Sequence, residues 1–458
     1  MPEPKPTRTA TSPLGRVLSA LAAIERHEVP TVVAAFLLFF CILGGYFAVR
    51  PVRDTVGTML GAARVADLWI ATWVASVAIV PLYGWVVGRV RRSVFLPWIY
   101  GMVSLALAVV GVALGGEAPS VGAGLFFYVF ISVLNLFLLS VFWSFLVELF
   151  DSGQARRLFP VIAAGGTAGA LLGPLFTDLT VRVIGNQGVL FLGAALFAVA
   201  IACQRALISI WVGGRGPERP DAAPVRGGRD RALGGNPFAG ISQVARSPYL
   251  IGIALYVALL ASASTFLYFE QLRLVELTFP DPAARTRVFA RIDWIVQGLT
   301  IVSQLFITGR LAQRWGVVVL LAMVPLAMIF GFLALAIWNS FTVLAVIFIA
   351  RRFGEYAFVR PGREMLWSPL DTETKYKAKN FVDVPVYRGA DALVAQLQQL
   401  IGAAGFGPQA LALCGAAVAS VWAVNGWWLG RRHDAARPVA ESSAPHGVPA
   451  VRPAGARP

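Results

Sequence analysis

The stretch PTVVAAFLLFFCILGGYFAVRPVRDTVG, residues 30–57, decides the fold. Its first part, from Thr31 to Val49, contains no charged residue. An apolar run of roughly 20 residues is long enough to cross the hydrocarbon core of a bilayer as a helix. The whole chain shares this character, because 57% of its 458 residues are hydrophobic and 14% are charged, against about 25% charged residues in a soluble domain. We therefore expect a polytopic membrane protein.

The other apolar runs, bounded by turn residues and charges, predict an all-α membrane protein with about twelve transmembrane helices in two halves. The first six candidate spans lie near residues 30–57, 66–87, 94–114, 121–149, 160–182 and 188–212. The second six lie near residues 247–272, 287–309, 316–337, 340–362, 383–404 and 407–430. The chain divides into an N-terminal segment, a first half, a linker rich in Gly, Pro and Arg, a second half and a disordered tail, at residues 1–29, 30–212, 213–245, 246–430 and 431–458.

Basic residues set the orientation of the predicted helices. The connections near 115–120, 338–340 and 403–408 contain no Lys or Arg, whereas the alternate connections are basic. Because cytoplasmic loops carry the excess of positive charge, both termini are expected in the cytoplasm. The same rule accounts for the net charge of +15, so we expect no nucleic-acid partner. The basic residues in or beside these loops that we expect to act in gating are Arg89, Arg156, Arg310, Arg363, Lys375, Lys379 and Arg388.

The two halves are related in sequence. The stretch from Gly84 to Arg92, after the second helix, is similar to the stretch from Gly309 to Gly316, after the eighth. Trp143-Ser144 recurs as Trp367-Ser368 at almost the same spacing. Duplicated six-helix halves resemble the major facilitator superfamily, whose members bind substrate between the halves near the membrane midplane. Each loop departs from that superfamily's motif at one position. Gly88 and Gln313 stand where the superfamily usually has Asp.

Glycines recur four residues apart in the fifth predicted helix, at Gly165, Gly169 and Gly173, and Pro174 follows. Glycines at this spacing share one helix face and let another helix approach closely. The pattern also resembles a Gly-x-x-x-Gly-Pro motif found at this position in exchangers of the superfamily. The sequence leaves both close packing and a role in antiport open.

The densest group of charges inside a predicted span is Arg50-Pro51-Val52-Arg53-Asp54. Ionisable groups at depth cost at least ~2.5 kcal/mol each, so they tend to face a cavity or a partner. If the helix continues through Pro51, Arg50 and Asp54 lie one turn apart. The arginines then form a platform for an anion, since the guanidinium fork suits phosphate. If the helix ends at Val49, these are loop charges outside the membrane.

Two further groups of charges lie inside predicted spans of the second half. Arg351 and Glu355 are four residues apart, so they either pair within the bundle or form part of a site with the adjacent Arg352. Glu270 and Arg273, near the end of the seventh helix, present the same two choices. The sequence alone does not separate an internal ion pair from a binding site.

Several stretches resemble the ATP/ADP antiporter family, the nucleotide transporters of obligate intracellular bacteria and plastids. They spread over most of residues 30–430 and include Tyr46 with Arg50-Pro-Val-Arg53-Asp54, the segment from Phe142 to Pro160, Glu270, and Arg363-Glu364-Met365 with the lysines at 375, 377 and 379. The resemblance implies exchange of adenine nucleotides, with Arg53, Glu148 and Glu270 in the charged positions used for transport. One stretch departs from the family, because Arg388-Gly389-Ala390-Asp391 stands where the family has Gly-Lys-Ser.

We therefore expect a secondary transporter that exchanges a nucleotide such as ATP or ADP, or another phosphorylated anion, by alternating access in a bacterial inner membrane. It is expected to work as a monomer in the lipid bilayer without a metal or other cofactor. Helices one, four, seven and ten should line the site, and in the unloaded carrier Glu148 and Glu270 should pair with its arginines. The expected substrate contacts are Tyr46, Arg50, Arg53, Asp54, Glu148, Glu270, Arg273, Arg351, Arg352 and Glu355.

Two other classes of function compete with this one. The first is proton-coupled efflux or uptake of an unrelated small molecule, with Asp178, Asp293 or Glu355 as the proton carrier, because burial favours the neutral form of a carboxyl group. The second is a membrane enzyme or scaffold. The sequence has no Walker motif, nucleophile elbow, HExxH or paired-cysteine site, and its cysteines lie in apolar runs, at Cys41, Cys203 and Cys414. We therefore do not expect an enzyme.

Overall fold

The computed structural model describes residues 24–87, 92–116, 120–213, 239–370 and 372–442. Within these ranges the regular secondary structure is helical. Eight of the described helices are long and apolar enough to cross a membrane, and the total of twelve crossings stays a prediction. They are α2 (Val29–Leu60), α3 (Ala62–Val87), α4 (Arg92–Leu114), α5 (Val121–Leu149), α6 (Ser152–Gly213), α8 (Pro248–Thr278), α10 (Thr308–Ile337) and α15 (Pro408–Ser442).

Two further stretches of helix are each interrupted by a π-helical turn. One consists of α11 (Phe341–Gly354), η1 (Glu355–Val359) and α12 (Arg360–Leu366). The other consists of α13 (Thr372–Phe381), η2 (Val382–Val386) and α14 (Tyr387–Ala403). The remaining helices are α7 (Ala239–Arg246) and α9 (Pro282–Phe306). π-turns inside α-helices are frequent at functional sites, and both of these turns lie beside buried charges described below.

The long helix α6 turns back at Gly185, where φ is 66°. Its first leg runs parallel to α2, because Gly165 faces Phe36 and Gly173 faces Gly44. Its second leg runs antiparallel to α2, because Gly193 faces Val49 and the later Phe197 faces the earlier Gly45. Glycine is suited to such a turn since it adopts positive φ without steric cost.

The glycine face of the first leg lies directly against the backbone of α2. A Cβ atom placed on Gly169 would lie 2.4 Å from the carbonyl oxygen of Phe40 and 2.8 Å from the nitrogen of Gly44. Any side chain there would force the two helices apart. The structure thus confirms close packing as one consequence of the glycine spacing.

The first helix continues through Pro51 to Leu60, which settles the choice left open by the sequence. Proline removes one helical N–H, and the hydroxyl of Thr55 donates to the carbonyl oxygen of Pro51 at 3.1 Å. Arg50, Arg53 and Asp54 therefore lie on one helix rather than in an external loop. Asp54 is buried, with 5% of its surface exposed.

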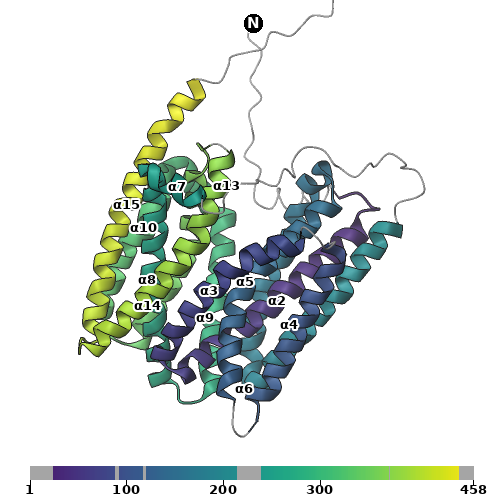
Figure 1. Ribbon diagram of the computed structural model, residues 1–458, viewed down its shortest axis with the longest axis horizontal. Helices are drawn as coiled ribbons and strands as arrows, with labels where there is room; N and C mark the ends of the chain where they lie inside the picture. The colour runs from purple at the N-terminus through teal and green to yellow at the C-terminus, as the bar shows by residue number, and fades with distance from the viewer. Residues whose placement is uncertain (1–23, 88–91, 117–119, 214–238, 371, 443–458) are drawn as a thin grey trace, which may run out of the picture.

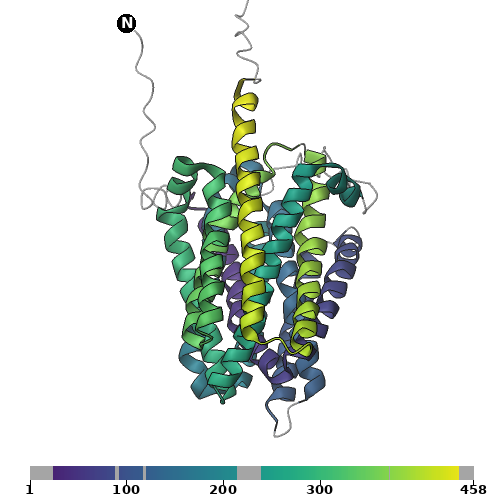
Figure 2. The same cartoon turned by 90° about the vertical axis from the view of Figure 1, so that its left-hand side faces the viewer.

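The molecule consists of two bundles, which lie side by side in Figure 1 and one behind the other in Figure 2. One apolar core is formed by α2, α4, α5 and α6, and a second by α8 to α15. A third, smaller cluster joins the bundles, with Val65 and Tyr128 from the first half and Tyr268, Phe269 and Leu272 from the second. The start of α2 and the end of α15 lie on the same side of the molecule (Figure 1).

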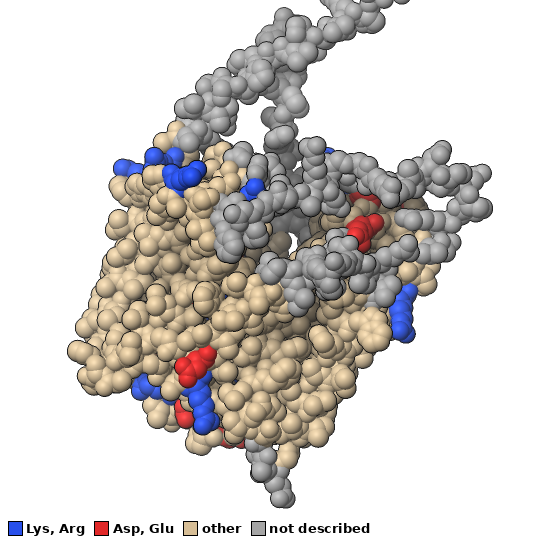
Figure 3. Space-filling view, in the orientation of Figure 1, with Lys and Arg blue, Asp and Glu red and all other residues tan. Residues whose placement is uncertain are grey.

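The visible face in Figure 3 carries its described charged side chains near the two ends, with a belt of other residues between them. Such a belt is what a bilayer requires of a lipid-facing surface.

The boundaries of two predicted segments differ from the structure. The linker predicted over 213–245 ends in the helix α7, whose Val244 is buried in the core of the second half. The predicted disordered tail begins as helix, because α15 runs on to Ser442. This extension has tertiary support, since a carboxylate oxygen of Asp434 accepts from the nitrogen of Val317 at 3.4 Å and His433 is buried.

Candidate functional site

Arg53 and Asp54 lie at the centre of a polar network on α2. The guanidinium of Arg53 donates to a carboxylate oxygen of Asp54 and, at 3.2 Å, to the hydroxyl of Ser132 on α5. It also lies 5.3 Å from the centre of the Tyr128 ring, within the range of a cation–π contact. The side chain of Arg53 is 12% exposed, so this arginine is held inside the protein.

Hydroxyl groups extend this network across the interface between the halves. Tyr268 on α8 donates to Asp54 at 3.0 Å, and its hydroxyl oxygen lies 2.8 Å from that of Tyr128. The indole nitrogen of Trp69 on α3 donates to the hydroxyl of Tyr128 at 2.9 Å. The rings of Trp69 and Tyr268 also pack together, with centroids 5.2 Å apart. The two halves are therefore joined at this level by aromatic residues whose polar groups are satisfied.

A second buried centre is formed by Asp293 on α9. A carboxylate oxygen of Asp293 accepts from Arg352 on α11 and lies 3.5 Å from a guanidinium nitrogen of Arg50 on α2. Asp293 and Arg352 are both buried, whereas the Arg50 side chain is 18% exposed. Asp293 thus shares its charge between an arginine of its own half and one of the other half.

The π-helical turn η1 organises a third group. Arg351 donates to Glu355 at 3.0 Å and also to the hydroxyl of Ser264 on α8. The other carboxylate oxygen of Glu355 lies 3.5 Å from Arg360, which stacks on Tyr356 at 4.3 Å from its ring centre. Two arginines, one before and one after the π-turn, therefore lie close to a single carboxylate of that turn.

A small cavity lies beside the Arg53 network at the interface of the halves. Arg53, Tyr128 and Ser132 line it from the first half, together with Trp69 and Thr72 of α3. The second half contributes two residues of α14, Arg388 and Asp391.

Arg53 and Arg388 approach each other across this cavity. Arg388 donates to the carbonyl oxygen of Ser132 at 3.4 Å, while Arg53 contacts the hydroxyl of the same residue. Two guanidinium groups from opposite halves therefore meet at one serine. An anion bound between two guanidinium groups would offset their mutual repulsion, and the guanidinium fork is the donor best matched to phosphate or carboxylate.

The two halves are also joined at the end away from the start of α2. Asp178 on α6 accepts from Arg287 at 3.1 Å, from Arg291 at 3.1 Å and from the indole of Trp294 at 2.9 Å, all three on α9. We call this group the Asp178 latch. Nearby, the hydroxyls of Thr55 and Thr286 lie 2.6 Å apart, and Arg285 donates to Thr58 at 2.9 Å.

Several residues predicted for the site lie outside the cavity lining. Glu270 and Arg273 pair with each other and with Asn339 inside the second half. Glu148 lies exposed near the end of α5, and Tyr46 is buried on α2 one turn before Arg50. The arginines at 50, 53 and 352 are paired with Asp54 and Asp293 rather than with the glutamates named for that role.

The predicted gating residues lie at several places. Arg363 is 3.5 Å from Asp383, and Lys379 is 2.6 Å from Glu364, so these pairs tie α12 to α13 and η2. Arg156 on α6 and Arg310 on α10 are exposed, and Lys375 on α13 is half-buried. Arg388 lies in the cavity, as described above. Arg89 lies outside the described residues.

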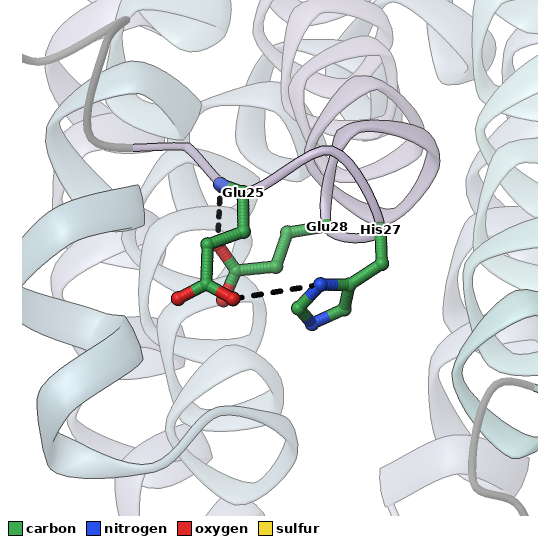
Figure 4. Close-up of side chains that lie close together, drawn as sticks. All are labelled: Glu25, His27 and Glu28. Carbon is green, nitrogen blue, oxygen red and sulfur yellow. Dashed lines mark hydrogen bonds and ion pairs between the residues drawn. The ribbon is translucent and has the colours of Figure 1, made fainter.

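Acidic and histidine side chains gather at the start of α2, where Figure 4 shows Glu25, His27 and Glu28. Their ligand atoms lie within 4.8 Å of one another. Arg157 of α6 lies 3.2 Å from Glu25 and 2.9 Å from Glu28. Both carboxylates therefore contact one arginine, and the group ties the start of α2 to the start of α6.

The sequence reasoning did not identify the uncharged residues of the cavity. Tyr128 and Ser132 carried a usable signal, since they are polar residues four apart in the otherwise apolar run of 121–149 and so share a helix face. Trp69 and Tyr268 carried none, because aromatic residues are common throughout transmembrane helices and at their ends. Only the packing of α3 against α8 gives them a role.

Comparison with known proteins agrees with the predicted resemblance. The chain is 23% identical to the ADP,ATP carrier protein 1 of Chlamydia trachomatis serovar D, over 91% of each chain. It is 24% identical to the protein of the same name from Chlamydia muridarum, over 86% of each chain, and 22% identical to that of Chlamydia pneumoniae, over 92% of this chain and 94% of the other. No protein-family model matches the sequence.

Solved structures show the fold. The nucleoside transporter NupG is 16% identical with a TM-score of 0.60, and the alignment covers 88% of this chain and 99% of NupG. A bacterial homologue of the lysosomal transporter Spinster is 15% identical with a TM-score of 0.55, covering 92% of this chain and 96% of the other. These likenesses confirm the predicted major-facilitator fold. The chain is a multi-pass membrane transporter of that fold, and its relatives in sequence are ADP,ATP carrier proteins.

Proposed function

We propose that this protein exchanges a nucleotide such as ATP or ADP, or a similar phosphorylated anion, by alternating access, and that the substrate binds in the cavity between the halves. The observation that carries the proposal is the balance of charge around that cavity. At the interface of the halves around it, five buried or partly buried arginines contact four carboxylates, because Asp293 serves two of them. The five are Arg50, Arg53, Arg351, Arg352 and Arg388.

An excess of guanidinium groups inside a membrane protein favours an anionic ligand. Buried charges are stable when they are paired, and the arginines beyond the available carboxylates lack a full charge partner. A phosphate group supplies negative charge and several acceptor oxygens, so it binds two guanidinium groups at once. Arg53 and Arg388, which come from opposite halves, are placed to bind one such group between them.

Three further observations support exchange of nucleotides. The sequence relatives are carriers named for ADP and ATP and match most of the chain. Trp69, a partly exposed aromatic residue that lines the cavity with Arg53 and Arg388, offers a surface on which a nucleobase can stack. The carboxylates Asp178, Asp293 and Glu355, which proton-coupled transport of an unrelated molecule would use, are each bonded to arginine.

The structure supports alternating access with one end of the interface closed. The contacts of Asp178, Thr55 and Thr58 with α9 close the end away from the start of α2. With both termini in the cytoplasm of a bacterial cell, as the basic loops predict, the closed end faces the periplasm. The carrier works as a monomer, because its cavity is built from the two halves of one chain.

Counterflow into reconstituted vesicles tests this function. Vesicles are loaded with unlabelled ADP or with buffer, and a trace of labelled ATP is added outside. Accumulation that depends on internal ADP is the expected result. Arg53→Gln should reduce the initial rate about tenfold or more, since a hydrogen bond to a charged group contributes about 1.5–3 kcal/mol.

Arg205→Gln is the matched control, because Arg205 is an exposed arginine on the second leg of α6, and its rate should stay within about twofold of the unmodified protein. The proposal fails for nucleotides if folded protein shows no ADP-dependent accumulation. The placement of the site fails if Arg53→Gln and Arg205→Gln behave alike.

A further inference from the structure

Among the four buried carboxylates Asp54, Asp293, Glu355 and Asp391, Asp391 is the one with no guanidinium within hydrogen-bonding distance. It lies on α14, lines the cavity and is 5% exposed. Its Oδ1 accepts one hydrogen bond, at 3.1 Å, from the hydroxyl of Thr265 on α8. Its Oδ2 lies 3.7 Å from Arg388, beyond hydrogen-bonding distance. An ionised carboxylate can accept about four hydrogen bonds. Asp391 therefore accepts few hydrogen bonds for a buried carboxylate.

The neighbouring carboxylates are held differently. Asp54 accepts from Arg53 and Tyr268, Asp293 accepts from Arg352, and Glu355 accepts from Arg351. Each has a guanidinium within hydrogen-bonding distance that balances its negative charge. Asp391 lacks that contact, so it has acceptor positions available to a proton.

The other charged groups near Asp391 do not supply the guanidinium contact that it lacks. On its own helix Arg388 is the charged neighbour, with the phenol of Tyr387 beside it. From α11 and η1 it faces Arg351 and Glu355, which neutralise each other as an ion pair. From α8 it faces the uncharged Thr265. Across the cavity lies Arg53, whose charge is paired with Asp54, and on α3 Asp67 bonds to Gln396, more than one turn away along α14.

Arg388 links the proton on Asp391 to the anion in the cavity. While Asp391 is ionised, its negative charge opposes an anion and attracts Arg388. When a proton from water binds a carboxylate oxygen of Asp391, the carboxyl group becomes neutral and Arg388 is left with an unbalanced positive charge. Protonation therefore strengthens anion binding, and by reciprocity a bound anion strengthens the binding of the proton.

We propose that Asp391 binds a proton together with the anionic substrate, so that each anion is carried with a proton. This inference rests on the proposed function, because it uses the same cavity and the same class of substrate. The step is a protonation only: an O–H bond forms on Asp391 as the anion binds, and the proton returns to water on the side where the anion leaves. Thr265 then donates its hydrogen bond to the ionised carboxylate again.

Binding of ADP to the purified protein tests the proposal at pH values from 7.5 to 8.5, where ADP itself keeps a nearly constant charge. The affinity of the unmodified protein should fall as the pH rises, by up to about tenfold per unit, because one proton is taken up with each anion. A pH indicator in weak buffer should report that uptake when ADP is added. Asp391→Asn should abolish both effects, and Asp391→Glu should retain them.

Glu276→Gln is the matched control, since Glu276 is an exposed carboxylate at the end of α8, and it should behave as the unmodified protein does. An affinity that is independent of pH, with no proton uptake by the unmodified protein, would overturn the inference while leaving nucleotide exchange intact. An unchanged pH dependence in Asp391→Asn would also overturn it. Absence of both ADP binding and counterflow would instead remove the proposed function.

Discussion

Asp178 and Asp391 are two buried carboxylates at the same interface between the halves, and they are bonded in opposite ways. Asp178 accepts hydrogen bonds from three side chains of α9. Asp391 accepts one, from a hydroxyl, and its arginine lies at 3.7 Å. The difference indicates separate tasks. A carboxylate whose acceptor sites are occupied holds two helices together, whereas one with vacant acceptor sites is available to a ligand or a proton.

The largest expected effect comes from removing a carboxylate that is hydrogen-bonded to a buried arginine. Asp293→Ala leaves Arg352 buried and unpaired, and breaking a buried pair in this way costs about 3–5 kcal/mol. Asp391→Ala should cost much less, because no arginine is hydrogen-bonded to that side chain. Thermal unfolding of the two variants in the same detergent measures this contrast. Equal losses of stability would contradict the idea that the hydrogen bond from Arg352 makes Asp293 more stabilising than Asp391.

An intermediate effect is expected at the Asp178 latch. Asp178→Asn removes the charge that holds two arginines of α9, and because Arg291 is half exposed, solvent screens part of the loss. We expect the open form of this end to gain about tenfold in population, the equivalent of about 1.4 kcal/mol. Spin labels at Val183 and Leu277, which are exposed on different halves, report the opening as a longer distance.

The control for the latch is Asp151→Asn, at the start of the same helix, where the side chain caps exposed backbone groups. Asparagine also caps helices well, so the distance distribution should not change. If both variants opened the labelled end equally, Asp178 would not be the residue that holds it closed.

The smallest effect is expected from single hydroxyl groups. Tyr268→Phe removes the hydrogen bonds to Asp54 and Tyr128 that cross the interface, each worth about 1 kcal/mol. We expect the rate of counterflow to fall severalfold. Tyr249→Phe makes the same change on α8, but its hydroxyl bonds to Leu366 within the second half, so the rate should change less than about twofold. Similar rates in the two variants would contradict a role for the tyrosine bridge.

Much of the candidate site could be predicted from the rule that charged residues inside apolar helices face a cavity or a partner. That rule selected Arg50, Arg53, Asp54, Arg352 and Glu355, and the structure places all of them around one interface. The choice of partners could not be predicted. Spacing along one helix suggests the pair of Arg351 with Glu355, but Asp293 bonds to residues of two other helices, and only tertiary packing brings these together.

Glu270 and Arg273 show the limit of the same rule. They satisfy it as well as the central residues do, yet they pair near the end of α8 with Asn339, which lies between α10 and α11. Depth along a span is poorly defined by sequence when the helix extends beyond the apolar run. The rule does not identify Tyr128, Tyr268 or Trp69, because it applies only to charged residues.

Both halves contain irregular turns in helices that carry the interface arginines. Pro51 interrupts the hydrogen-bond ladder of α2 because it lacks an N–H. In the second half η1 and η2 widen the ladder, and η2 also contains Pro385, so that the nitrogen of Arg360 donates to Glu355 and that of Tyr387 to Val382. Each half thus has an irregular stretch of helix beside the arginines, and these stretches can act as hinges at the depth of those arginines.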